Sequence, residues 1–163
     1  MFSPLLRTSN RLSFFVFMVV VAVIATNAQT TRKVANHSPS EDPSPLFLEY
    51  RGVQLGMTAD EVRKKLGEPK EKGDEQDFYI FNENETAQFL YDKTRKVTAI
   101  SADFTTVGAN VPTAKGVFGA EIEAKADGSV YKLVRYPKAG YWLSYNRTSG
   151  NSPLTTVTLQ KIQ

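Results

Sequence analysis

The chain contains no cysteine and only one histidine, His37, among its 163 residues. Without cysteine it can form no disulfide, so its folded part must rely on a hydrophobic core. The N-terminal cysteine that carries the acyl chains of bacterial lipoproteins is missing as well, and we therefore expect no lipid anchor. Zinc sites made of cysteine and histidine, and catalytic triads built on either residue, are excluded by the same scarcity. We expect neither a metal nor a cofactor.

A strong excess of basic charge is also missing once the N-terminus is set aside. Residues 1–28 hold two arginines and no acidic residue, which leaves 18 basic against 17 acidic residues in the remainder. The isoelectric point of the whole chain, near 9.1, is therefore raised by this segment. It does not indicate a nucleic-acid partner.

The first 28 residues have the pattern of an export signal. Two arginines precede Leu12–Ala25, a run of 14 residues in which Ser13 is the one polar member, and Thr26-Asn27-Ala28 offers small residues for cleavage. The apolar run is shorter than the roughly 20 residues that span a membrane. We expect a protein exported to the periplasm, the cell envelope or the medium, with membrane contact only if the signal stays uncleaved.

The rest of the chain divides into a linker and one folded domain. Residues 29–45 are rich in Thr, Ser and Asn and include Pro39, Pro43 and Pro45, which is typical of a disordered linker. Residues 46–163 contain the regular apolar patterns and are long enough for one compact domain.

A helix is predicted from Thr58 to Leu66. Thr58 can accept a hydrogen bond from a free backbone N–H of the first turn, and Glu61, three residues later, completes a capping box. Gly67 can adopt the left-handed conformation that ends a helix, and Pro69 prevents the helix from continuing. Leu66 is expected in the core.

Short runs of β-forming residues separated by turns predict six strands. These are Asp77–Phe81, Ala87–Tyr91, Lys96–Phe104, Ser129–Tyr136, Gly140–Tyr145 and Leu154–Ile162. A weaker helix, Asn110–Phe118, precedes the last three. A shift of 52 residues brings Leu66-Gly67 onto Phe118-Gly119. The order predicts an α+β fold of two αβββ repeats, about 53–104 and 105–163, with the helices packed on one face of an antiparallel sheet.

The first repeat resembles a known family in its helix unit and in the strands after it. The matching residues are Gly56-Met57-Thr58, Val62, Leu66-Gly67, Pro69, Phe78-Tyr79-Ile80-Phe81, Phe89-Leu90-Tyr91 and Val97-Thr98-Ala99-Ile100. They resemble the BamE/SmpA/OmlA family of small outer-membrane assembly proteins, and the tandem arrangement is similar to the β-lactamase inhibitor protein fold. The first resemblance implies a role in envelope assembly. The second implies a secreted enzyme bound through a sheet surface with exposed aromatics.

Alternation along the predicted strands divides the apolar residues between two faces. The face predicted as core carries Tyr79, Phe81, Phe89, Tyr91, Tyr131, Leu133, Tyr141 and Leu143. The opposite face carries Phe78, Ile80, Leu90, Val130, Val134 and Trp142. The exposed face of an antiparallel sheet is normally polar. We therefore expect either that residues 46–55 cover this second face, which we favour because the segment is available, or that it binds a partner.

The candidate protein-binding residues are Trp142, Leu90, Phe78, Ile80 and Val130. The leading hypothesis is a non-enzymatic envelope protein of the interaction or assembly type, with an envelope protein as partner. The alternative is an inhibitor of a secreted or periplasmic enzyme.

A carboxylate-dependent hydrolase is a third hypothesis. Acid–base catalysis needs two carboxylates held in unlike environments. The neighbouring pairs are Asp60 with Glu61, Asp74 with Glu75, and Glu121 with Glu123. A solvated surface position explains all six more simply.

We predict that the signal is removed on export, because small residues end at Ala28 directly after the apolar run. N-terminal sequencing of the exported protein should begin at Gln29. An intact Met1 terminus in the membrane fraction would refute cleavage.

Overall fold

The structure is a computed structural model that describes residues 45–105 and 110–162. The predicted signal, residues 1–28, and the linker up to residue 44 lie outside the described residues, so neither prediction is tested by the fold.

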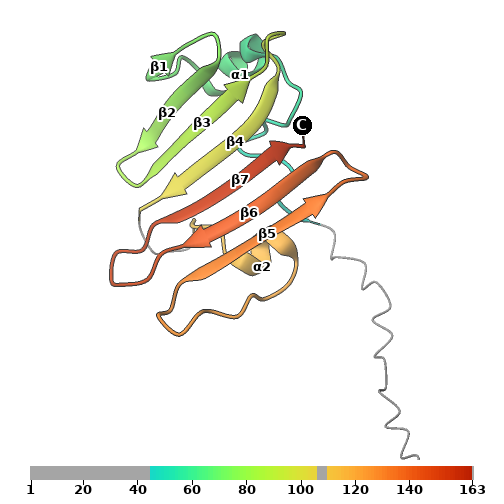
Figure 1. The fold of residues 1–163 in the computed structure, drawn as a ribbon. Coiled ribbons are helices and arrows are strands. Elements are labelled where there is room, and N and C mark those ends of the chain that lie inside the picture. The colour runs from blue at the N-terminus through green and yellow to red at the C-terminus, as the bar shows by residue number, and fades with distance from the viewer. Residues whose placement is uncertain (1–44, 106–109, 163) are drawn as a thin grey trace, which may run out of the picture. The chain divides into compact units, whose positions relative to one another are not determined.

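One seven-stranded sheet dominates the described residues (Figure 1). Along the chain the elements are α1 (Ala59–Leu66), β1 (Glu71–Lys72), β2 (Gln76–Asn82), β3 (Glu85–Tyr91), β4 (Val97–Phe104), α2 (Ala114–Phe118), β5 (Val130–Tyr136), β6 (Tyr141–Arg147) and β7 (Thr155–Lys161). The strand order is β1-β2-β3-β4-β7-β6-β5, and every neighbouring pair is antiparallel. The six predicted strands are therefore present, and β1 is an addition.

The prediction of an α+β fold is wrong, because the described part of the chain is an all-β sheet with two short helices. The helices have eight and five residues. The predicted helix Asn110–Phe118 begins only at Ala114, since Thr113 is its N-cap in an extended conformation and its hydroxyl accepts from the N–H of Gly116. Pro112, which lacks an N–H, lies in the chain before the cap.

Two antiparallel meanders meet in the middle of the sheet. The first consists of β2, β3 and β4, and the second of β5, β6 and β7. They are joined by β4 and β7, which pair from Ala99 with Gln160 to Phe104 with Thr155. The last strand of the described chain therefore lies in the centre of the sheet, between β4 and β6.

One face of the sheet carries the core. Its largest fully buried side chains are Phe89, Phe118, Ile100, Leu143 and Leu159. The two helices contribute Ala59, Val62, Val117 and Phe118 to the same cluster. Leu66, which we expected in the core, is only partly buried against it, whereas Val62, one turn earlier, is fully buried.

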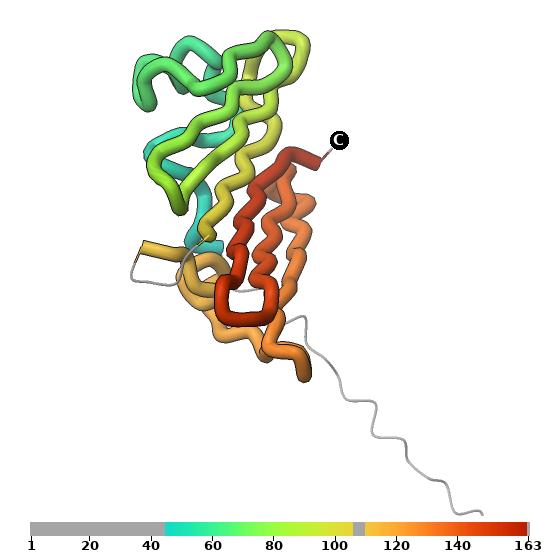
Figure 2. The backbone as a smooth tube through the Cα atoms, turned by 90° about the vertical axis from the view of Figure 1, so that its left-hand side faces the viewer, coloured from blue at the N-terminus to red at the C-terminus, as the bar shows by residue number. Residues whose placement is uncertain are grey.

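The segment 46–55 lies on the core face, so the expectation that it covers the opposite face is wrong. The ring of Tyr50 packs against three aromatic rings of the sheet, those of Phe81, Phe89 and Phe104. The Tyr50 hydroxyl donates to Glu85 at 2.6 Å, and Arg51 pairs with the same carboxylate at 2.8 Å. Figure 2 shows this segment and α2 on the same side of β6 and β7.

The capping box of α1 is present as predicted. The Thr58 hydroxyl accepts from the N–H of Glu61, and the Glu61 carboxylate accepts from the N–H of Thr58 at 2.8 Å. Two backbone donors that the helix leaves unpaired are satisfied in this way.

We predict that Thr58→Ala lowers the free energy of unfolding by about 0.5–2 kcal/mol, because it removes the oxygen that caps α1. Chemical denaturation at neutral pH measures the loss. Thr58→Ser keeps the hydroxyl and should stay close to the wild type. Equal losses in the two variants would contradict a capping role.

Candidate functional site

The face of the sheet opposite the core is open in the described part of the chain, and we call it the open face. Cross-strand register arranges its side chains in three rows that run across the strands. The first row is Arg135–Trp142–Gln160–Ala99–Leu90–Gln76. The second is Leu133–Ser144–Thr158–Ser101–Gln88–Phe78, and the third is Tyr131–Asn146–Thr156–Asp103–Thr86–Ile80. Directly opposed residues of an antiparallel pair share a face, so each row is a line of neighbours.

Large apolar side chains lie toward the two outer sides of the open face. Three of the six exposed large hydrophobic residues are here: Ile80 at 52 %, Tyr131 at 53 % and Leu133 at 43 % exposure. Phe78, Leu90 and Trp142 are half-buried on the same face. Exposed apolar residues that gather on one face indicate a contact surface, whereas singly scattered ones are normal on any protein.

Small and polar side chains fill the middle of the open face, along β4 and β7 of the described chain, and Asp103 is the one charged residue among them. Ser101 and Thr158 share a hydrogen bond at 3.2 Å across the join between the two meanders. The Thr156 hydroxyl donates to Asp103 at 2.6 Å in the next row. The central polar groups therefore hold one another in place.

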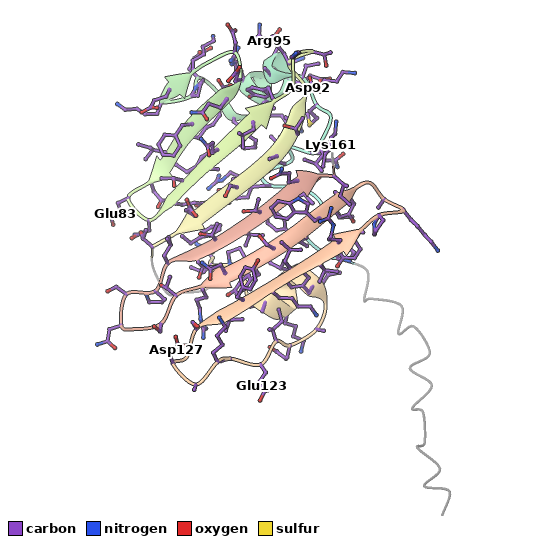
Figure 3. All side chains as sticks on the ribbon, viewed as in Figure 1. Glu83, Asp92, Arg95, Glu123, Asp127 and Lys161 are labelled. Atoms are coloured by element: carbon purple, nitrogen blue, oxygen red, sulfur yellow. The ribbon has the colours of Figure 1, made fainter. Side chains whose placement is uncertain are left out.

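Charge is scarce on the open face and abundant around it. On the described strands, the residues of this face with a charge are Glu71, Asp103 and Arg135. Figure 3 looks onto the face, and the charged residues labelled there lie on turns, loops and strand ends around its rim: Glu83, Asp92, Arg95, Glu123, Asp127 and Lys161. The centres of protein interfaces are depleted in charge and enriched in aromatic residues in the same way.

Four of the five candidate binding residues lie on the open face, and Val130 does not. Phe78, Ile80, Leu90 and Trp142 are placed there, whereas Val130 is 5 % exposed and belongs to the core cluster. The placement of Val130 on the binding face is therefore wrong.

The prediction assigned the core-facing and open-facing residues of β5 the wrong way round, because this strand has apolar residues on both sides. Val134 opposes the buried Leu143 and faces the core with Val130, and Lys132 places its ammonium 5.5 Å from the ring of Phe118. Tyr131 and Leu133, which the 52-residue shift assigned to the core, are exposed. The β2–β3 pairing has a register shift between Ile80 and Asn82, whereas the β5–β6 pairing is uninterrupted, so β5 presents the opposite set of residues to the core.

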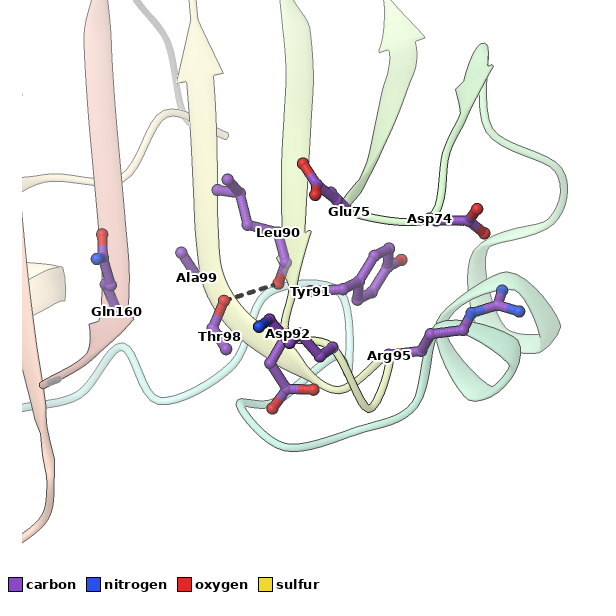
Figure 4. A pocket seen from close by; sticks show the side chains of 10 residues that line it. Asp74, Glu75, Leu90, Tyr91, Asp92, Arg95, Thr98, Ala99 and Gln160 are labelled. Atoms are coloured by element: carbon purple, nitrogen blue, oxygen red, sulfur yellow. Dashed lines mark hydrogen bonds between the residues drawn. The ribbon is translucent and has the colours of Figure 1, made fainter.

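A depression of about 690 Å³ lies where the first row of the open face meets two turns. Leu90, Ala99 and Gln160 contribute to it from the open face, and charged residues of the β1–β2 and β3–β4 turns stand around them (Figure 4). Thr98 donates to the carbonyl of Leu90 at 3.2 Å beside it. The depression extends the open face, and we treat the two as one site.

The paired carboxylates do not form a catalytic pair in a cleft. All six lie at exposed positions of the described chain. The backbone and side-chain hydrogen bonds from Thr58 lower the pKa of Glu61, which is the reverse of what a general acid requires. Within residues 45–105 and 110–162 no cluster of His, Asp and Glu is suited to a metal ion, and no helix is long and apolar enough to cross a membrane.

The sequence did not predict the role of Asp77, a buried carboxylate with several hydrogen-bond donors around it. It is fully buried and accepts from Arg63 through two bonds of 2.8 Å, from the Tyr91 hydroxyl at 2.8 Å and from the N–H of Gly73 at 3.2 Å. Burial by itself raises the pKa of Asp77, but these hydrogen bonds outweigh it and hold the pKa below its usual value. The carboxylate ties α1 to β2 and β3 and has its acceptor positions filled, which indicates a structural role.

Comparisons with models of known families, with curated proteins and with solved structures find no match to this chain. The resemblance to the BamE/SmpA/OmlA family and to the β-lactamase inhibitor protein fold therefore stays a prediction.

We predict that Asp77→Asn costs about 3–5 kcal/mol of unfolding free energy at neutral pH, because the largely buried Arg63 loses its buried counter-charge and keeps only the exposed Asp60, 3.7 Å away. The folded-state pKa of Asp77 is lowered, so its contribution is present above the unfolded value of about 3.9 and is lost as the pH falls through the folded value. The difference in unfolding free energy between wild type and variant should therefore become smaller on acidification to about pH 2. Denaturation curves at several pH values test this, with the exposed Asp74→Asn as control. A gap that is constant with pH would contradict the ion pair.

Proposed function

We propose that this protein is an exported, non-enzymatic binding module of the cell envelope that holds a partner protein on its open face. The observation that carries the proposal is the composition of that face. Its rows combine Trp142 and five other large apolar side chains with hydroxyl and amide groups, and most of the charge lies at the rim, with Asp103 as the one charged residue that the described strands β4 and β7 contribute to the face. A surface of this kind can be desolvated cheaply, because little charge must leave water.

The geometry also supports a sizeable contact. The open face extends over six strands of one continuous sheet, because the pairing of β4 with β7 leaves no break between the meanders. The hydroxyl groups of Ser101 and Thr158 are hydrogen-bonded to each other, that of Thr156 donates to Asp103, and the outer apolar groups remain partly exposed. We therefore expect the apolar residues to supply most of the binding energy and the central strip to supply fit.

An inhibitor of a secreted or periplasmic enzyme is the second candidate. The uninterrupted sheet surface with exposed aromatics is the feature that this role would use, as the resemblance to the inhibitor fold implies. The two candidates predict different effects on the activity of the captured partner. An inhibitor should abolish the turnover of a captured enzyme at one molecule of protein per enzyme, whereas an assembly module should leave its partner's activity unchanged.

We predict that Trp142→Ala and Ile80→Ser each weaken partner binding by at least about 2 kcal/mol, which is about thirtyfold, because each removes a large apolar side chain that the partner would bury. The partner is first identified by photo-crosslinking from the position of Ile80, and its affinity for the purified variants is then measured. Because Trp142 is half-buried, Trp142→Ala should cost less stability than the about 3–5 kcal/mol of a full core truncation.

The matched control is Leu46→Ser. Leu46 is 65 % exposed, comparable with Ile80 at 52 %, but it precedes α1 and lies off the open face. Binding should survive this change. Equal losses in the Leu46 and Ile80 variants, or unchanged binding in both open-face variants, would remove the support for the open face as the binding surface.

A further inference from the structure

A second, more apolar pocket lies on the core side of the sheet, away from the open face. It has a volume of about 460 Å³, within the range of about 300–1,000 Å³ that small-molecule sites occupy. Its walls come from three parts of the chain: the segment before α1, the β5–β6 turn and the end of β7. The apolar members are Leu48, Leu55, Ala139, Tyr141, Leu159 and Ile162. The depression on the open face differs, because five charged residues line it.

Lys161 is the one charged residue in the lining of this second pocket. It forms no ion pair and donates no hydrogen bond to any residue in the described part of the chain. Figure 3 shows it at the C-terminal end of β7. The Asp92 carboxylate is close enough for the Lys161 charge to contribute to lowering the pKa of Asp92, but the two are not in salt-bridge contact.

Tyr141 brings a second polar group to the same place. It is directly opposite Lys161 in the β6–β7 register, so the two side chains leave the sheet on one face at neighbouring positions. The Tyr141 hydroxyl has no hydrogen-bond partner among the described residues. Burial raises the pKa of Tyr141, which keeps the hydroxyl protonated and able to donate. Gln54, the other polar residue of the lining, already donates its amide to Glu49 at 3.0 Å.

We propose that this pocket binds a single-chain amphiphile that ends in a carboxylate. The chain lies against Leu48, Leu55 and Ile162, and the carboxylate accepts from the Lys161 ammonium and the Tyr141 hydroxyl. An apolar cleft with one free cation and one free hydroxyl donor selects an anion with an apolar tail over a neutral or cationic molecule. This site shares no residue with the open face, so the inference does not depend on the proposed function.

The test uses the exported, purified protein and three probes of equal chain length: decanoate, decyl maltoside and decyltrimethylammonium, each below its micelle concentration. Isothermal titration should give saturable binding of one decanoate per protein. Binding of the neutral and the cationic probe should be at least tenfold weaker. Equal affinity for all three, or no saturable binding of decanoate, overturns the proposal.

Substitutions separate the head-group contacts from general apolar adsorption. Lys161→Met keeps the apolar stem and should weaken decanoate binding at least tenfold without changing the affinity for decyl maltoside, and Lys161→Arg should restore it. Tyr141→Phe should cause a loss of several-fold. Lys125→Met, at an exposed lysine of the loop before β5, is the matched control and should bind like wild type.

Nuclear magnetic resonance locates the ligand independently of any variant. Decanoate should shift the methyl resonances of Leu48, Leu55 and Ile162. Shifts confined to Ile80 and the other residues of the open face would overturn the proposal, as would unchanged decanoate affinity in folded Lys161→Met. Thermal unfolding of each variant establishes that it is folded.

Discussion

The antiparallel pairing of β4 with β7 is the constraint on which the rest of the structure depends. Each meander alone would leave β4 or β7 as an unpaired edge strand, which is prone to association with other chains. The pairing closes both edges at once. On the core side it sets Ile100 against Leu159 and Ala102 against Val157, and on the open face it sets Ser101 against Thr158. A single register therefore makes both faces of the sheet continuous.

Much of the strand pattern could be predicted from the sequence because its signals are local. Runs of β-forming residues between turns marked all six of the longer strands, and the Thr58 cap marked α1. The fold class was not predicted correctly in this way, since the two predicted helices are only eight and five residues long and the sheet dominates the described residues. The position of residues 46–55 depends on Glu85, more than thirty residues away, and no local pattern contains that contact.

The candidate site was predictable only in part. Alternation placed Phe78, Ile80 and Leu90 on the correct face, and the burial of side chains along β2 and β3 does alternate. It misplaced Val130, because β5 is apolar on both sides and its orientation is decided by its pairing with β6. The scarcity of charge on the open face can be seen only when the strand pairing is known, because it involves residues of several strands. The same holds for the second pocket, whose walls meet from three separated segments.

The central place of β7 has a consequence for the order of folding. β7 follows all the other strands of the described residues along the chain, yet it pairs with both β4 and β6, so the sheet cannot close before β7 has been synthesised. Contacts between segments so far apart form slowly, because a long loop must first be closed. If the N-terminal segment directs export, as its sequence predicts, a nascent chain would reach the translocation machinery before its sheet could close. The topology would then itself delay folding until the chain had crossed the membrane.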